Sequence, residues 1–229
     1  PIMSFPLRKN QFGYMNLSLQ KFLGFDNSIC YTKKTSSNSD KRLKQQKYCI
    51  VRLGVEKNKF QSFLEVIASV INYYSGMKNL PGPEQNDMSL KDFKSLFIEN
   101  LTIDKFVMAQ NGILPKLFSK TDIDIDLRKY RSSVYFENII DDDYKIYIAQ
   151  SFENFKEYIM SNDEYIDYKY IWDFITKPTE KEGLFFDKGI NLLIFKNPND
   201  DITQKIELIC PTNHYSNEFF NTEKKTLML

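Results

Sequence analysis

Three carboxylates in the last third of the chain, Asp173, Asp187 and Glu207, are candidates to hold a divalent metal ion. In a metal-dependent nuclease, acidic side chains hold the ion that activates water for attack on a phosphate. Such enzymes place an acid and then a lysine two residues apart on one strand. Here the order is reversed, because Lys205 precedes Glu207. A divalent-metal-dependent nuclease domain is therefore an alternative interpretation, and we expect no catalytic residue.

The cysteines and the single histidine are the side chains that could hold zinc or act as a nucleophile with its base. Three thiolates and one imidazole make an acceptable tetrahedral zinc set, but the chain has no Cys-x-x-Cys pair. A Cys/His nucleophile pair would also need a third group to orient the imidazole. The sequence leaves zinc binding undecided for the set Cys30, Cys49, Cys210 and His214.

The cysteine count also bears on the compartment. Three widely separated cysteines are too few for a disulfide framework, so we expect buried, inert cysteines and a reducing, intracellular environment. No glycine-rich loop that could cradle a phosphate is present, since the glycines at 54, 76, 82 and 112 are isolated. We therefore expect no nucleotide cofactor, and we assign no residue as a metal ligand.

A basic segment is the strongest binding signal. Residues 31–60 contain nine Lys/Arg and two acids. Lysine dominates this segment, which suits contact with phosphates as point charges better than bidentate reading of bases. Two tyrosines, Tyr31 and Tyr48, add aromatic rings nearby. We predict that duplex DNA is contacted through Lys41, Arg42, Lys44, Lys47 and Arg52.

Residues 121–182 have the opposite balance, with fifteen acids and eight bases. This polarity suits a protein in which one end meets a polyanion while the other avoids it or meets a basic partner. Two ordinary solvated faces would give the same balance. A protein-interaction module, in which acidic helices within residues 141–175 dock a basic partner, is a further alternative.

The elements that must position these residues indicate an α+β fold. The chain has 229 residues, of which 42% are hydrophobic, enough to bury a core. Its longest apolar run, at 192–195, is too short to cross a membrane, and no secretory signal opens the chain. Helical spacing of apolar residues predicts helices at 17–23, 58–76, 89–97, 103–110, 141–160 and 163–175.

Strands are predicted where β-forming residues cluster or alternate with polar ones. The expected strands are 48–53, 122–127, 190–195, 205–210 and a last one beginning at 226. Turn residues at 197–201 predict that two of them form a C-terminal hairpin in a small antiparallel sheet. We expect residues 1–229 to be one α+β fragment of a longer chain, with a candidate sub-boundary at 78–88, where Leu-Pro-Gly-Pro breaks the pattern.

Residue usage indicates an AT-rich genome, such as that of a large DNA virus or a parasite, because Lys, Asn, Ile, Phe and Tyr abound while Ala and Arg are scarce. Several scattered blocks carry a family resemblance: 13–14, 17–23, 26–28, 52–56, 61–64, 67–68 and 210–216. In these blocks the chain resembles the large subunit of the early transcription factor of nucleocytoplasmic large DNA viruses.

The resemblance implies a promoter-recognition factor that acts with a viral RNA polymerase and with a second, helicase-like subunit. It implies no catalytic residue in this chain. Combined with the basic segment, it leads us to expect a non-catalytic DNA-binding or assembly module of a viral early transcription initiation factor. Its expected location is the virion or the viral factory in the host cytoplasm, with no membrane association.

Overall fold

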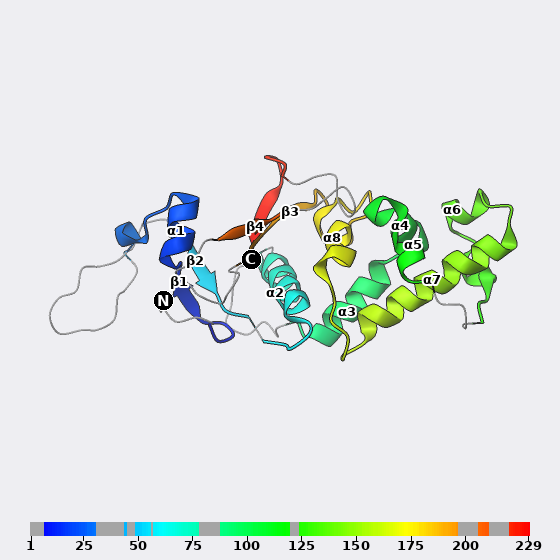
Figure 1. The fold of residues 1–229 in the computed structure, drawn as a ribbon, viewed down its shortest axis with the longest axis horizontal. Coiled ribbons are helices and arrows are strands. Elements are labelled where there is room, and N and C mark those ends of the chain that lie inside the picture. The colour runs from blue at the N-terminus through cyan, green and yellow to red at the C-terminus, as the bar shows by residue number, and fades with distance from the viewer. Residues whose placement is uncertain are drawn as a thin grey trace. The chain divides into compact units, whose positions relative to one another are not determined.

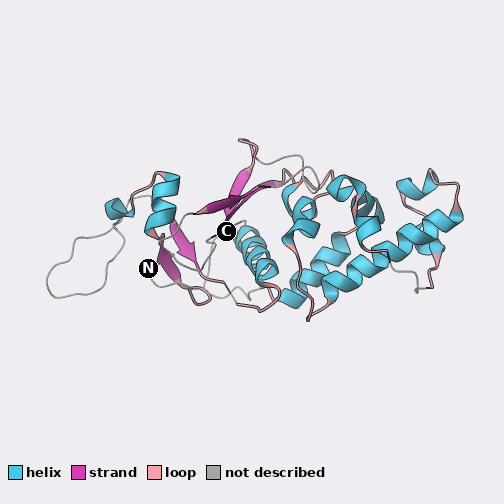
Figure 2. Cartoon of the chain, in the orientation of Figure 1, coloured by secondary structure: helices cyan, strands magenta, loops and turns pink. Residues whose placement is uncertain are grey.

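The structure is a computed structural model that describes residues 7–30, 44, 49–55, 57–77, 88–119, 124–196, 206–210 and 220–229 (Figure 1). The chain divides into two compact units. Unit 1 comprises Pro1–Lys57 and Ile194–Ile209, and unit 2 comprises Asn58–Leu193 and Cys210–Leu229. The described parts on either side of the expected sub-boundary at 78–88 both belong to unit 2. Helices and two small sheets confirm the α+β class (Figure 2).

Unit 1 is small and is built around two short strand pairs. Its elements are β1 (Phe12–Tyr14), α1 (Leu17–Leu23), the 3-10 helix η1 (Asn27–Cys30), β2 (Val51–Leu53), the end of β3 (Ile190–Lys196) and β4 (Glu207–Ile209). Helix α1 has the predicted bounds. It begins because the side chain of Asn16 accepts a hydrogen bond from the Leu19 N–H at 2.7 Å. It ends at Gly24, whose φ of 63° suits glycine.

Unit 2 contains the large hydrophobic core and most of the helices. These are α2 (Ser62–Met77), α3 (Leu90–Asn100), α4 (Ile103–Met108), η2 (Ala109–Gly112), α5 (Leu114–Leu117), η3 (Leu127–Tyr130), α6 (Val134–Glu137), α7 (Asp142–Met160) and α8 (Tyr168–Thr176). Helix α7 packs against α3, α4 and α5 (Figure 1). The apolar stripes predicted within residues 60–74 and 148–159 supply buried core residues such as Leu64, Ile67, Phe155 and Ile159.

Side-chain caps define where the helices of unit 2 begin. Ser89 and Asp92 form a capping box at α3, and Asp141 caps α7. At α2 only one half of such a capping box is formed. Asn58 accepts hydrogen bonds from the N–H groups of residues 60 and 61, but the Gln61 amide donates instead to the Ser161 carbonyl at 2.7 Å.

Two further expectations about local structure are corrected. The strand predicted at 122–127 is not formed in the described part, because residues 124–126 are irregular and Leu127–Tyr130 is a 3-10 helix. The cause is Asp126, whose carboxylate accepts a hydrogen bond from the Arg128 N–H and caps the turn. The helix predicted from residue 163 begins only at Tyr168, where Asp167 caps it.

The C-terminal strands form a mixed sheet rather than the small antiparallel one expected. Strand β3 pairs antiparallel with β4, as the predicted hairpin requires, through Ile194–Ile209, Phe195–Leu208 and Lys196–Glu207. Strand β5 (Lys225–Met228) pairs parallel with the first half of β3. The side-chain amide of Asn191 helps to hold β5, since it donates to the Asn221 carbonyl and accepts from the Asn221 N–H, both at 2.8 Å.

Candidate functional site

The expectation of three buried, inert cysteines is wrong. Cys30 and Cys49 form a disulfide whose Cα atoms lie 5.9 Å apart, and Cys210 is exposed. The bond removes two of the four side chains considered for zinc, and His214 lies outside the described residues. Disulfides are exceptional in a reducing compartment. The number of cysteines alone is therefore no basis for placing this protein in such a compartment.

The disulfide encloses residues 31–48, which contain four of the five predicted DNA contacts. Residues 31–48, between the bonded cysteines, contain Lys33, Lys34, Lys41, Arg42, Lys44 and Lys47, with Asp40 as the single acid. The backbone N–H of Lys44 donates to the Cys30 carbonyl at 2.9 Å, and the Lys44 side chain is exposed. Of the predicted DNA contacts, Lys41, Arg42 and Lys47 lie outside the described residues.

Arg52, the fifth predicted contact, has an internal partner. It lies on β2 opposite Gly13, and its Nε donates to the Tyr14 carbonyl on β1 at 2.6 Å. The side chain is half-buried, and burial lowers its pKa. Arg52 therefore joins the two strands, whereas Lys44 presents its charge to solvent.

Backbone contacts fix the end of β2 to the start of unit 1. The Gly54 N–H donates to the Gln11 carbonyl, and the Asn10 N–H donates to the Gly54 carbonyl, both at 2.9 Å. A Cβ on Gly54 would lie 2.0 Å from the Arg8 carbonyl oxygen, so only glycine fits this approach. The disulfide joins the end of η1 to Cys49, just before β2, and the β1–β2 pair holds β2 in place.

The charge asymmetry of the sequence coincides with the division into units. Unit 1 contains 13 Lys/Arg and 6 Asp/Glu, a net charge of +7, and unit 2 contains 18 Lys/Arg and 24 Asp/Glu, a net charge of −6. The exposed cations described in unit 1 are Arg8, Lys9, Lys21, Lys44, Lys57 and Lys196. A polyanion therefore meets favourable charge in one unit and unfavourable charge in the other.

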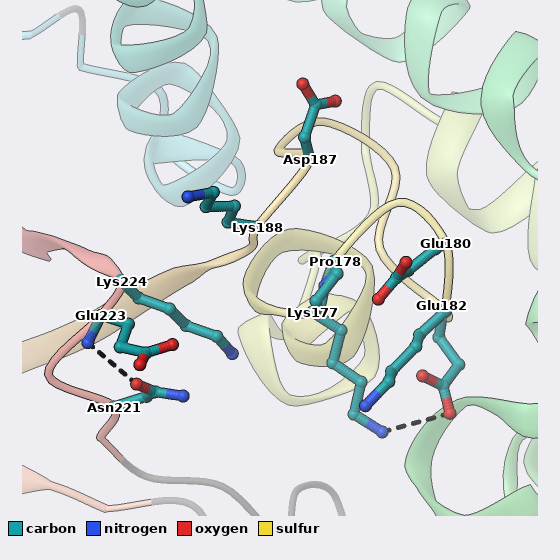
Figure 3. A pocket seen from close by; sticks show the side chains of 10 residues that line it. Lys177, Pro178, Glu180, Glu182, Asp187, Lys188, Asn221, Glu223 and Lys224 are labelled. Atoms are coloured by element: carbon teal, nitrogen blue, oxygen red, sulfur yellow. Dashed lines mark hydrogen bonds and ion pairs between the residues drawn. The ribbon is translucent and has the colours of Figure 1, made fainter.

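Charged side chains also line a hollow of about 690 Å³ in unit 2 (Figure 3). Four lysines and four acids line it, so its lining has no net charge. The side chain of Lys177 turns toward Glu182, and their Nζ and Oε1 atoms lie 3.2 Å apart (Figure 3). The lysines and acids that line the hollow thus partly neutralise one another.

Asp173, the first of the candidate metal ligands, is a buried structural residue. One of its carboxylate oxygens, Oδ2, lies 3.3 Å from the Lys177 Nζ and accepts a hydrogen bond from the Gln110 N–H at 2.8 Å. Burial raises the pKa of this carboxyl, and the Gln110 and Lys177 contacts oppose the rise. The Gln110 contact holds α8 against η2, and the Lys177 contact lies at the C-terminal end of α8.

The other two candidate ligands do not join Asp173 in a cluster. Asp187 lines the hollow and extends away from Lys177 (Figure 3). Glu207 belongs to unit 1, whereas Asp173 and Asp187 belong to unit 2. Over the described ranges, no group of three or more His, Cys, Asp or Glu side chains is arranged to hold a metal ion. Nor is any helix in those ranges long and apolar enough to span a bilayer.

Comparisons with protein-family models, with curated protein sequences and with solved structures give no match to this chain. The candidate interface is therefore assigned from the charges and contacts of unit 1 alone.

Proposed function

We propose that unit 1 binds the phosphate backbone of duplex DNA, and that the chain is a non-catalytic DNA-binding or assembly module of a viral early transcription initiation factor. The observation that carries the proposal is the segregation of charge, +7 in unit 1 and −6 in unit 2. A polyphosphate chain is attracted to the first and repelled by the second, so one unit provides the binding surface.

The segment between Cys30 and Cys49, residues 31–48, supplies four of the five proposed contacts. Lysine and arginine side chains there neutralise phosphates and release condensed counterions, which gives affinity without sequence readout. A disulfide at the ends of the segment limits the conformations of the unbound chain, and so lowers the entropy lost on binding. The proposed contacts remain Lys41, Arg42, Lys44, Lys47 and Arg52, with Arg52 also joining β1 to β2.

The family resemblance supplies the biological setting of the proposal. The DNA would be promoter duplex, and the partners would be a viral multisubunit RNA polymerase and a second transcription factor subunit. The setting would be the virion or the viral factory. The disulfide is compatible with a protein that passes through an oxidising environment when packaged or released.

Charge reversal tests the assignment of the interface. The variant Lys41→Glu, Arg42→Glu, Lys44→Glu is compared with a matched control that reverses the same number of charges at three exposed lysines of unit 2, Lys91→Glu, Lys116→Glu, Lys129→Glu. Fluorescence anisotropy of a labelled duplex should show loss of binding in the first and little change in the second. If both variants bind like the parent protein, the basic segment is not the interface.

A nuclease assay separates the proposal from the enzymatic alternative. Supercoiled plasmid is incubated with the protein and Mg²⁺ or Mn²⁺, and the proposal predicts that the plasmid stays intact. Cleavage that is lost in Glu207→Ala would favour a metal-dependent nuclease over a binding module.

A further inference from the structure

Unit 2 presents a surface that combines exposed apolar side chains with acids, formed by α6 and the start of α7. We call residues 134–144 the α6–α7 surface. Val134 is 67% exposed, Ile140 is 98% exposed and Tyr144 is 43% exposed. Apolar area left in water forgoes roughly 25 cal/mol per Å² of stabilisation, so a partner that covers this surface gains by burying it.

The α6–α7 surface is held in place by the rest of unit 2. The Asp104 carboxylate on α4 accepts hydrogen bonds from the Ser133 hydroxyl and from the Tyr135 N–H, both at 2.8 Å. The hydroxyls of Tyr135 and Tyr144 lie 3.4 Å apart and join α6 to α7. These contacts fix the surface before any partner arrives, which reduces the ordering cost of docking.

The charge of the surface selects the kind of partner. Residues 132–144 contain four exposed acids, Glu137, Asp141, Asp142 and Asp143, and no Lys or Arg. The bases that flank this stretch are Arg131, which is exposed, and Lys145, which pairs with Asp142 at 3.3 Å. Helix capping accounts for Asp141, but it does not account for the exposure of Val134 and Ile140. Nucleic acid and anionic lipid would be repelled here.

The aromatic side chains at the start of α7 also suit cations. The rings of Tyr144 and Tyr147 stack with centroids 5.9 Å apart and planes inclined by 23°. Tyrosine faces attract lysine and arginine side chains, as carboxylates do. The same surface therefore offers aliphatic contacts, ring faces and negative charge within a few residues.

We propose that the α6–α7 surface docks a short basic amphipathic segment of another protein. Aliphatic side chains of that segment would cover Val134 and Ile140, and its lysines or arginines would pair with Glu137, Asp142 and Asp143. This surface belongs to unit 2 and is independent of the DNA-binding proposal for unit 1.

The test uses a labelled amphipathic peptide of lysine and leucine as the probe for the full chain. Two matched peptides, one with glutamate for lysine and one with serine for leucine, separate the charge and apolar contributions. The variant Val134→Ser, Ile140→Ser should bind the lysine/leucine peptide at least about tenfold more weakly. The control Met160→Ser, Tyr165→Ser, at exposed positions at and just beyond the C-terminal end of α7, should bind like the parent chain.

Several outcomes would overturn the proposal. Equal affinity for the lysine and glutamate peptides would show that the acids of the surface do not select a basic partner. Unchanged binding by Val134→Ser, Ile140→Ser would show that the peptide does not bind at the α6–α7 surface. Equal weakening of the control variant would make the binding unspecific. Sedimentation of the chain alone would assign the surface to a second copy if a dimer formed and Ile140→Ser dissociated it. Duplex binding should be unaffected by these variants, so the two proposals fail separately.

Discussion

Cys30 and Cys49 lie 19 residues apart in the sequence and are joined by a disulfide, with their Cα atoms 5.9 Å apart. Cys30 is fully buried and Cys49 is half-buried just before β2. The backbone N–H of Lys44 donates to the Cys30 carbonyl, so the proposed DNA-binding segment is tied to the disulfide by a hydrogen bond as well. The stability of unit 1 should therefore depend on the oxidation state of this pair.

Cys49→Ser should lower the free energy of unfolding of unit 1 by about 3 kcal/mol, because the crosslink limits the unfolded chain. Hydrogen exchange of the β1–β2 amides, with and without reductant, measures this directly. The only tryptophan, Trp172, lies in unit 2, so its fluorescence reports the other unit. Cys210→Ser is the control and should leave exchange unchanged. Three free thiols in the protein purified without reductant would contradict the disulfide.

The contact between Asp173 and Gln110 should be a large contributor to the stability of unit 2. Gln110 has a φ of 52°, an uncommon conformation for a residue other than glycine, and Asp173 accepts its N–H hydrogen bond. Asp173→Ala leaves that N–H buried without its acceptor, which should cost about 2 kcal/mol. Urea unfolding followed by Trp172 fluorescence measures the loss. A change within ~0.5 kcal/mol, as for an ordinary surface substitution, would contradict the role.

The same carboxyl should give stability a characteristic pH dependence. Burial raises the pKa of Asp173 above its ordinary 3.8, so the folded state favours the protonated form. Its stabilising contribution is full below pH 3.8 and is lost as the pH rises through the folded pKa. Asp173→Asn cannot ionise, so its stability relative to the parent should increase from acid to neutral pH. A constant difference between the two proteins would contradict the shift.

Tyr158 should make unit 2 sensitive to alkali. Its hydroxyl donates to the Tyr165 carbonyl and accepts from the Asp167 N–H, both at 2.8 Å. Burial raises its pKa to about 12, so stability from this group is full below pH 10 and is lost between pH 10 and 12. Tyr158→Phe should be less stable at neutral pH, by about 1–2 kcal/mol, because both backbone groups lose their partner. The stability of the variant should also fall less between pH 10 and 12 than that of the parent protein. The same dependence of stability on pH in both proteins would contradict this role of Tyr158.

The capping box at α3 gives a simpler prediction. Ser89→Ala removes the acceptor of the Asp92 N–H, which lies 3.1 Å from the Ser89 hydroxyl. The free energy of unfolding should fall by about 1 kcal/mol, as for other helix N-caps. Ser132→Ala, at an exposed position outside any helix, is the control. Equal stability of the Ser89 and Ser132 variants in thermal unfolding would show that the cap contributes nothing measurable.

Local sequence patterns predicted most of the helices, because apolar spacing and capping residues act within a few positions. Helix α1, whose predicted and observed bounds agree, is an example. The Gln61 side chain donates a hydrogen bond to a carbonyl a hundred residues away, so local patterns could not predict this contact. The disulfide was missed for the same reason, since the fold of unit 1, and not sequence spacing, brings Cys30 to Cys49.

The candidate site was predicted only in part. Composition located the basic segment, and the division into units agrees with its charge. Composition could not tell that Arg52 has a backbone partner on the neighbouring strand or that Asp173 is buried beside Lys177. Both depend on contacts between residues far apart in the chain. The exposed apolar residues Val134 and Ile140 gave no sequence signal, because isolated apolar residues near a helix start are ordinary.

The salt dependence of binding to a labelled duplex tests the central claim most directly. Each phosphate neutralised by a lysine or arginine should add about 0.9 to the slope of log K against log salt concentration. We predict a steep linear decline for the parent protein, and a slope smaller by about 2.7 for Lys41→Glu, Arg42→Glu, Lys44→Glu if residual binding remains measurable. An affinity that stays flat from low to moderate salt would contradict a phosphate-binding role for unit 1.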